Sequence, residues 1–321
     1  MTSRARIVLL YFAAAAVAFA CGVLFGAVGI PLSEFIHDGA LDPIVQLRLV
    51  RTASAAVAGA SLAVSGLVFQ AVLRNALAEP FLLGVSGGAG LGAAGAILLG
   101  FGAWGFMSVP LFALLGAVTA NLLVFVSVRR HTAEELVLGG VMIGTLASSL
   151  LMVLITFSHS QDMAGVIWWM LGSVQNVDPL RQLAPAAAVL TAVLVFLLFR
   201  AGDVDLLTFG PEYAWNHGVN ARVMTILLLA LASLLAAVTV SMAGIIGFCG
   251  LVVPHIVRRL HGGSHRKILI PAALAGAAFL MLADILGRVV SPVRELPVGM
   301  VTAAVGCPVF LWLLNRSRAG S

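Results

Sequence analysis

Apolar runs of about 20 residues recur along this chain from its beginning to its end. A run of that length forms a helix long enough to cross the hydrocarbon core of a membrane. Since 61% of the residues are hydrophobic and 10% are charged, too little polar sequence remains to build a water-soluble domain. We therefore expect an all-α, polytopic membrane protein with about ten spanning helices in a single transmembrane domain, residues 1–321.

The positions of the spans follow from the apolar runs, with boundaries defined to within about two to four residues. The expected spans are residues 7–29, 52–73, 81–101, 107–128, 135–157, 183–199, 221–242, 244–260, 268–290 and 298–315. The longest pieces between them, at 30–51, 158–182 and 200–220, are each too short for a hydrophobic core of their own. The whole chain is therefore expected to lie in the membrane or immediately beside it.

Glycine and proline mark the third and eighth spans. The eighth is interrupted by Gly244, Gly247, Gly250 and Pro254. A short interrupted helix usually borders a cavity, because lipid offers no partners for broken backbone hydrogen bonds. The many glycines of the third span have a plainer explanation, which is close packing of one helix backbone on another.

The distribution of Arg and Lys predicts the orientation of the spans, because cytoplasmic loops are enriched in both. One face of the membrane holds Arg4, Arg6, Arg74, Arg129, Arg130, Arg200, Arg222, Arg258, Arg259, Arg266, Lys267, Arg316 and Arg318. The other face holds Arg48, Arg51, Arg181, Arg288 and Arg294. This asymmetry places both termini in the cytoplasm. The first apolar run is longer than the core of a cleaved signal peptide, so we expect it to be retained as a span.

Ionisable residues inside spans often mark a proton or ion path. Asp284 is the one acid well inside an apolar run, and Arg288 follows it by about one helical turn. The two either neutralise each other on one helix face or belong to a proton relay. An ion-coupled secondary transporter is the alternative class, and the scarcity of such acids argues against it. The cysteines at 21, 249 and 307 lack metal-binding spacing, and no catalytic set is visible at membrane depth, so we expect neither a metal site nor an intramembrane enzyme.

No phosphate-binding loop is present either. Such a loop needs Gly-x-x-x-x-Gly-Lys-Ser/Thr, whereas the one lysine of this chain, Lys267, follows an arginine. If ATP drives this protein, a partner subunit must bind ATP and Mg²⁺ and act mechanically on a cytoplasmic surface of this chain. We expect the chain itself to carry no catalytic residues and no cofactor.

Residues 207–219 have the features of a short helix outside the membrane. Pro211 suits the first helical position, Glu212 suits the positive N-terminus, and Gly218 suits a left-handed stop. The candidate contact residues are Phe209, Gly210, Pro211, Glu212, Tyr213, Trp215 and Gly218. The aromatic side chains either anchor the segment at the lipid interface or dock into a partner, and we favour docking.

Several ordered motifs carry a family resemblance over nearly the whole chain. They are 47–51 (LRLVR), 58–66 (AGASLAVSG), Gln70 with 74–80 (RNALAEP), 83–89 (LGVSGGA), 169–173 (WMLGS), 244–258 (GIIGFCGLVVPHIVR), 283–284 (AD) with Arg288, 295–299 (ELPVG) and 306–310 (GCPVF). In these motifs the chain resembles the iron-chelate and cobalamin permeases, the membrane subunits of type II ABC importers.

The resemblance implies the type II ABC importer permease fold and a homodimer with a central path. Its partners would be two cytoplasmic ATPase subunits and a periplasmic or lipid-anchored binding protein. The cargo would be a metal chelate, whether ferric siderophore, haem or cobalamin, carried across the bacterial inner membrane by alternating access. Nucleic acid has no place in this assembly.

The resemblance also implies roles for individual residues. Gate and path positions are Asn75, Leu77, Ala133, Glu134, Thr145 and Ser148, and positions that face acidic groups of the binding protein are Arg48, Arg51 and Arg288. These arginines have the alternatives of holding lipid headgroups or, at Arg288, of pairing with Asp284. Val50 and Ala76 stand where relatives usually have proline, so the turn at 74–80 is expected to be less rigid. For Glu134, a gate role and simple stabilisation of a helix N-terminus both remain open.

Overall fold

The computed structural model of the chain describes residues 3–26, 36–37, 40–128, 132–290 and 295–318. Its long helices are α1 (Ser3–Leu24), α2 (Pro43–Val72), α3 (Val85–Leu98), α4 (Ser108–Ser127), α5 (Ala133–Thr156), α7 (Ala184–Phe199), α10 (Ala221–Ala243), α11 (Cys249–His261), α12 (His265–Val290) and α13 (Val298–Arg318). The shorter elements are β1 (Ile36–His37), β2 (Ala40–Leu41), η2 (Phe101–Trp104), α6 (Ser160–Met170), η3 (Pro179–Leu183), α8 (Ala201–Thr208) and α9 (Pro211–Asn216).

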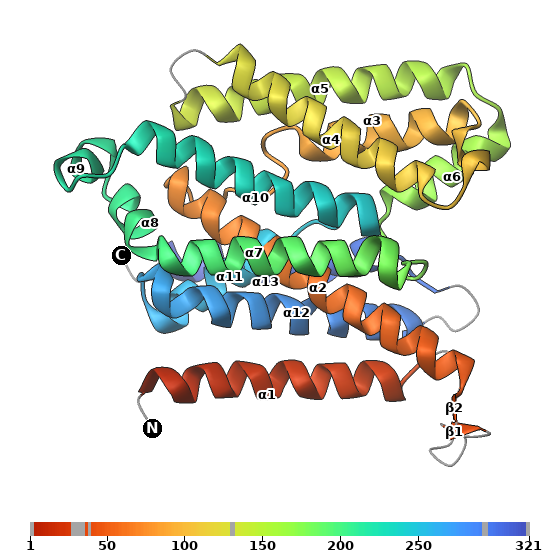
Figure 1. Ribbon diagram of the computed structural model, residues 1–321, viewed down its shortest axis with the longest axis horizontal. Coiled ribbons are helices and arrows are strands. Elements are labelled where there is room, and N and C mark those ends of the chain that lie inside the picture. The colour runs from red at the N-terminus through yellow and green to blue at the C-terminus, as the bar shows by residue number, and fades with distance from the viewer. Residues whose placement is uncertain (1–2, 27–35, 38–39, 129–131, 291–294, 319–321) are drawn as a thin grey trace.

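The long helices lie side by side as a bundle, and its two ends differ (Figure 1). At one end lie α8, α9 and the N-terminal end of α1, and we call this the α9 end. At the opposite end, the hairpin end, β1 and β2 form an antiparallel pair in which Ile36 lies opposite Leu41. α2 runs from the hairpin end toward the α9 end, whereas α5, α10 and α12 run the other way.

Each of the ten predicted spans corresponds to one long helix, so the all-helical, polytopic fold predicted from the sequence is confirmed. Within the described residues, seven helices are long and apolar enough to cross a membrane: the helical stretches 5–24, 43–72, 108–127, 133–156, 179–199, 221–243 and 265–290. The other three are shorter: α3 has 14 residues, α11 has 13, and the apolar part of α13 ends at Trp312.

The predicted boundaries are wrong at a few places. α2 begins at Pro43 instead of 52, because the Asp42 side chain accepts a hydrogen bond from the backbone N–H of Ile44 and proline starts the helix. α1 ends at Leu24, and the predicted continuation at 27–29 lies outside the described residues. Two short helices, α6 and α8, lie in segments predicted to be connections.

α2 forms the centre of the bundle. Its most apolar stretch is 89% buried, against 17% for α1 and for α5. α10, α11 and α12 pack around α2, while α1, α4, α5 and α7 keep large apolar side chains exposed. Such exposure suits helices that face lipid or another protein chain in a membrane.

Small residues set the close helix contacts, as the glycines of the third span predict. A Cβ on Gly88 of α3 would stand 2.3 Å from the carbonyl oxygen of Gly116 on α4, and one on Gly116 would stand 2.1 Å from the carbonyl oxygen of Gly88. Neither position accepts a side chain, so the two backbones touch.

The predicted interruption of the eighth span is confirmed, but its place differs. Residues 244–248 are not helical, with φ of 69° at Gly244 and 67° at Phe248. Gly250 and Pro254 lie inside α11, and the Gly250 carbonyl that Pro254 leaves without its intrahelical donor accepts from the Gln70 side chain instead. A left-handed conformation at a phenylalanine costs about 1–2 kcal/mol, so the contacts around Phe248 must stabilise it.

Candidate functional site

The turn that follows α2 holds two of the predicted gate residues. The chain turns at Arg74, with φ of 49°, and the Asn75 side chain accepts a hydrogen bond from the backbone N–H of Leu77 at 2.9 Å. This local bond fixes the turn without the proline that relatives usually have. Residues 74–77 are all exposed, and Leu77 exposes 51% of its surface. The turn therefore presents an apolar side chain at the surface of the bundle.

The predicted short helix in 207–219 is present as α9. Pro211 is its first residue, and Gly210 and Gly218 both have positive φ, of 117° and 81°. The helix has six residues, which make about one turn and a half. Ala214 is buried, whereas Phe209, Tyr213 and Trp215 are exposed. We call these three exposed side chains the aromatic face of α9, the helix that lies at one end of the bundle.

This aromatic face is internally ordered. The rings of Phe209 and Tyr213 lie 5.2 Å apart, and those of Tyr213 and His217 lie 4.2 Å apart. The His217 Nδ1 also hydrogen-bonds to the backbone carbonyl of Tyr213 at 2.8 Å. A preordered aromatic surface loses little side-chain entropy on docking, which favours it as a contact surface.

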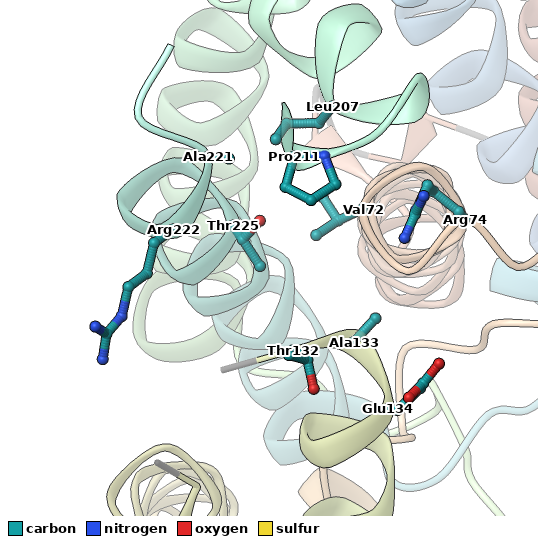
Figure 2. A pocket seen from close by; sticks show the side chains of 10 residues that line it. All are labelled: Val72, Arg74, Thr132, Ala133, Glu134, Leu207, Pro211, Ala221, Arg222 and Thr225. Atoms are coloured by element: carbon teal, nitrogen blue, oxygen red, sulfur yellow. The ribbon is translucent and has the colours of Figure 1, made fainter. Parts of the chain in front are cut away.

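A hollow of about 360 Å³ lies beside α9, where Pro211 and the predicted gate residues Ala133 and Glu134 line it (Figure 2). We call it the α9 hollow, and its lining residues are Val72, Arg74, Thr132, Ala133, Glu134, Leu207, Pro211, Ala221, Arg222 and Thr225. Pro211 and Leu207 face the end of α2 across it, with the start of α5 opposite, while the Arg222 side chain points away. Glu134 both lines the hollow and lies in the first turn of α5, so the structure accommodates both roles left open for it.

A second hollow, of about 390 Å³, runs along α5, and we call it the α5 hollow. It brings together the predicted path residues Thr145 and Ser148 with part of the α2–α3 turn (residues 73–84) and the start of α3. The Thr145 hydroxyl donates to the Val141 carbonyl at 2.8 Å, so this hydroxyl is already hydrogen-bonded within α5. Asn75 and Leu77 line neither hollow.

Glu79 is a residue of this site that sequence analysis missed. It follows an exposed turn and lies outside every apolar run, so no intramembrane pattern marks it. The structure folds the α2–α3 turn back onto the bundle, where Glu79 lines the α5 hollow and accepts a hydrogen bond from the backbone N–H of Phe248 at 3.2 Å. Its place in the RNALAEP motif was the one available signal.

The three predicted docking arginines lie together near the hairpin end, and they are more buried than docking would suggest. Arg48 donates to the carbonyls of Val23 and Leu24, and Arg288 donates to that of Gly22 at 3.1 Å. Residue exposure is 5% for Arg48 and 2% for Arg288, and the Arg51 side chain is 12% exposed. These side chains therefore hold α1 against α2 and α12.

Two acids complete this cluster, which we call the arginine cluster. Arg51 pairs with Asp284 at 2.8 Å and with Glu295 at 2.5 Å, and Arg288 pairs with Asp284 at 3.0 Å. Of the two alternatives for Asp284 and Arg288, the structure shows the pairing, and the bridge from Arg51 to both acids was not foreseen. Three cations against two carboxylates leave the cluster with a formal charge of +1.

Residues 14–316 match the FecCD transport family. The chain belongs to this family. It is 41% identical over 273 residues to the vitamin B12 import system permease protein BtuC of Salmonella arizonae. The aligned region covers 85% of this chain and 82% of that protein. It is 40% identical over 274 residues to the BtuC of Escherichia coli O9:H4, and the aligned region covers 85% of this chain and 83% of that protein.

Solved structures agree with this membership. An inward-facing metal-chelate type ABC transporter matches with a TM-score of 0.88 and 27% identity, over 98% of this chain and 99% of that chain. PsaBC of Streptococcus pneumoniae, solved with a Fab, shares the fold alone, with a TM-score of 0.57 and 16% identity. The match covers 83% of this chain and 90% of that chain. Together with the apolar helices, the FecCD membership makes this chain a multi-pass inner-membrane protein and a permease of the kind that ABC importers contain.

Proposed function

We propose that two copies of this FecCD permease form a path for a metal chelate, driven by two cytoplasmic ATPase subunits. The observation that carries the proposal is the α9 hollow, around which Pro211, the end of α2 and the start of α5 meet. A force applied to α9 would reach α2 through α8 and α10, each of which contacts both α9 and α2. ATP and Mg²⁺ would be bound by the ATPase partner, and this chain would carry out no chemistry itself.

The proposed cycle is alternating access. ATP draws the ATPase subunits together, α9 moves with them, and the two permease copies change their tilt. α5 and α13 would line the path, with Thr145 and Ser148 on its wall and Asn75, Leu77, Ala133 and Glu134 near its cytoplasmic exit. A mostly apolar wall would bind the cargo weakly and so release it.

The α9 end would lie in the cytoplasm together with both termini, and the hairpin end would face the binding protein. The arginine cluster near the hairpin end has a net positive charge that would attract acidic groups of that partner. Arg51 is the best candidate for direct contact, because its side chain is the most exposed of the three. Arg48 and Arg288 would act mainly by holding α1.

A corrinoid is the first cargo to test, since both named permease relatives import vitamin B12. The experiment is uptake of radiolabelled cyanocobalamin into proteoliposomes that hold the permease, its ATPase and its binding protein. We expect uptake that requires ATP and all three proteins. A ferric siderophore and haem, tested in the same vesicles, identify the cargo if cyanocobalamin is not taken up. Uptake driven by a proton gradient without the ATPase would contradict the proposal and favour a secondary transporter.

A further inference from the structure

A carboxyl group from another part of the chain holds the start of α11, and a second one holds the start of α12, just beyond the end of α11. The 13 residues of α11 span about 20 Å, from the non-helical segment 244–248 to the corner that leads into α12. One carboxyl group, Glu79, belongs to the α2–α3 turn, which holds the predicted gate residues. The other, Asp205, belongs to α8, which immediately precedes the coupling helix α9.

At the first end, three contacts join the α2–α3 turn and α2 to the start of α11. The Glu79 carboxylate accepts the N–H of Phe248, the residue that caps α11. Pro80 packs so closely on Gly250 that a Cβ there would stand 2.4 Å from the proline ring. The Gln70 side chain donates to the Leu251 carbonyl at 3.1 Å. The start of α11 therefore cannot shift without moving the turn.

Phe248 connects this contact to α13. A Cβ on Gly306 would stand 2.6 Å from the Cβ of Phe248, so the phenylalanine fits only against a bare backbone. Within the part of the chain that the structure describes, Glu79 has no ion-pair partner. Its contact with α11 is instead the placement of a carboxylate at a positive helix N-terminus.

At the second end, Asp205 fixes the corner between α11 and α12. Its carboxylate accepts from the Ser264 hydroxyl at 3.2 Å and from the backbone N–H of His265 at 2.9 Å, and it contacts His265 Nδ1 at 2.5 Å. His265 is 2% exposed and the Asp205 side chain is 30% exposed, so this anchor for α8 is buried on the α12 side. A displacement of α8 and α9 is thereby transmitted to the corner where α11 ends.

We propose that α11 is the lever that carries motion from the coupling segment to the gate, and that Glu79 is the positioning residue at its tip. The inference rests on the proposed function, because it needs a moving α9 and a gate at Asn75–Leu77. A helix whose start is bonded to Glu79, and whose end leads into the corner bonded to Asp205, supplies the contiguous connection that coupling requires. The Glu79–Phe248 bond passes the motion to the α2–α3 turn, and the Phe248–Gly306 contact passes it to α13.

The test compares Glu79→Ala with Glu79→Gln in the reconstituted permease–ATPase–binding protein complex. Glutamine keeps an oxygen that accepts the Phe248 N–H, whereas alanine removes it. The gate is monitored by cross-linking Asn75→Cys between the two copies, with Cys21 and Cys307 replaced by Ser. We expect the background protein to change its cross-linking yield on ATP binding, and Glu79→Ala to lose that change. Cobalamin transported per ATP should fall about tenfold in Glu79→Ala and less than twofold in Glu79→Gln.

A matched control separates transmission from simple loss of packing. Asn121→Ala removes a hydrogen bond of 3.0 Å to Ser233, between α4 and α10 and away from α11. We expect the same complex recovery for Asn121→Ala and Glu79→Ala, with the gate response lost only in the second. Equal loss in both variants, or equal loss in Glu79→Gln and Glu79→Ala, overturns the positioning role of Glu79.

The two anchors act in series, so their effects should not add. Asp205→Ala alone should also uncouple ATP hydrolysis from uptake, and the double variant with Glu79→Ala should be no worse than the more severe single variant. Additive losses of uptake in the double variant overturn the lever. It is also overturned if the background protein transports cargo while the yield of Asn75→Cys cross-linking stays the same with and without ATP. A background complex that hydrolyses ATP but imports none of the tested chelates contradicts the proposed function instead.

Discussion

Arg51 of α2 reaches across to α12 and pairs with Asp284 at 2.8 Å, although 233 residues separate the two in sequence. Both side chains are largely buried, so the pair lies where water screens it poorly. Removing one partner of such a pair leaves the other charge without compensation, and this is costlier than losing a surface pair.

The stability of the permease should therefore depend on Arg51. Arg51→Ala should lower the free energy of unfolding by about 3 kcal/mol, because Glu295 loses its partner and Asp284 keeps only Arg288. Arg51→Lys should recover part of this loss, since one ammonium group cannot match the forked guanidinium. Denaturant unfolding in detergent measures both. Arg181→Ala, on the exposed surface of η3, is the control and should change the free energy of unfolding little. Equal losses of unfolding free energy in Arg51→Ala and Arg181→Ala would contradict the importance of the arginine cluster.

Docking of the binding protein should respond to the same residue more weakly. Arg51→Gln should reduce affinity by about fivefold at low salt, since a partly exposed charge contributes about 1 kcal/mol. The difference from wild type should shrink as salt is raised. A binding titration across a salt series checks this, with melting temperature confirming the fold. If Arg181→Gln has the larger effect, the docking surface lies over η3 instead.

The aromatic face of α9 should couple ATP hydrolysis to uptake. Tyr213→Ala combined with Trp215→Ala should dissociate the ATPase or leave it hydrolysing ATP without uptake, because the exposed rings supply most of the contact area. The membrane part should still fold, since Ala214 is the residue of α9 that packs inward. Co-purification and uptake assays measure the two outcomes. Unchanged recovery and unchanged uptake would leave these rings with only a role at the lipid interface.

The exposed turn after α2 should be sensitive to size. Leu77→Trp should block release of the cargo while leaving binding-protein docking intact, because a larger ring at an exposed gate position narrows the exit. Leu77→Met, of similar volume, should behave as wild type. Uptake and docking assays on the same preparations distinguish the cases, and normal uptake in Leu77→Trp would place the exit elsewhere.

The corner held by Asp205 predicts a dependence of stability on pH. Burial raises the pKa of Asp205, but hydrogen bonds and charge attraction from His265 outweigh it and hold the pKa below its ordinary value. Its stabilising effect is thus complete above the ordinary aspartate pKa of about 4 and is lost as pH falls through the lower folded value. Asp205→Asn should melt about 2–4 °C lower than wild type at pH 7, and the two should converge in acid.

Asp203→Asn provides the control for this prediction. Asp203 lies on the same helix and pairs with Arg200, whose side chain is 49% exposed, so its loss should matter little. Melting curves between pH 7 and acid compare the three proteins. A gap between wild type and Asp205→Asn that stays constant with pH would contradict the role of the ionised carboxylate.

Local patterns in the sequence predicted the long helices and the short helix α9, because apolar run length, Pro211 and Gly218 each act within one element. The arrangement of the site was harder to predict. Glu79 gains its role only when the α2–α3 turn folds back onto Phe248, a contact 169 residues away. The burial of Arg48 and Arg288 likewise depends on backbone carbonyls of α1, which no side-chain pattern reveals.

The hydrogen bond from Arg288 to the carbonyl of Gly22 has a consequence for biogenesis. α1 is synthesised before the other described helices, yet it packs mainly against α12, whose Arg288 follows Gly22 by 266 residues. Until α12 has been synthesised, α1 must lie in the lipid without this partner, and its exposed apolar side chains allow that. Truncated chains that end before α12 should therefore retain an inserted but undocked first helix, open to membrane proteases and quality control.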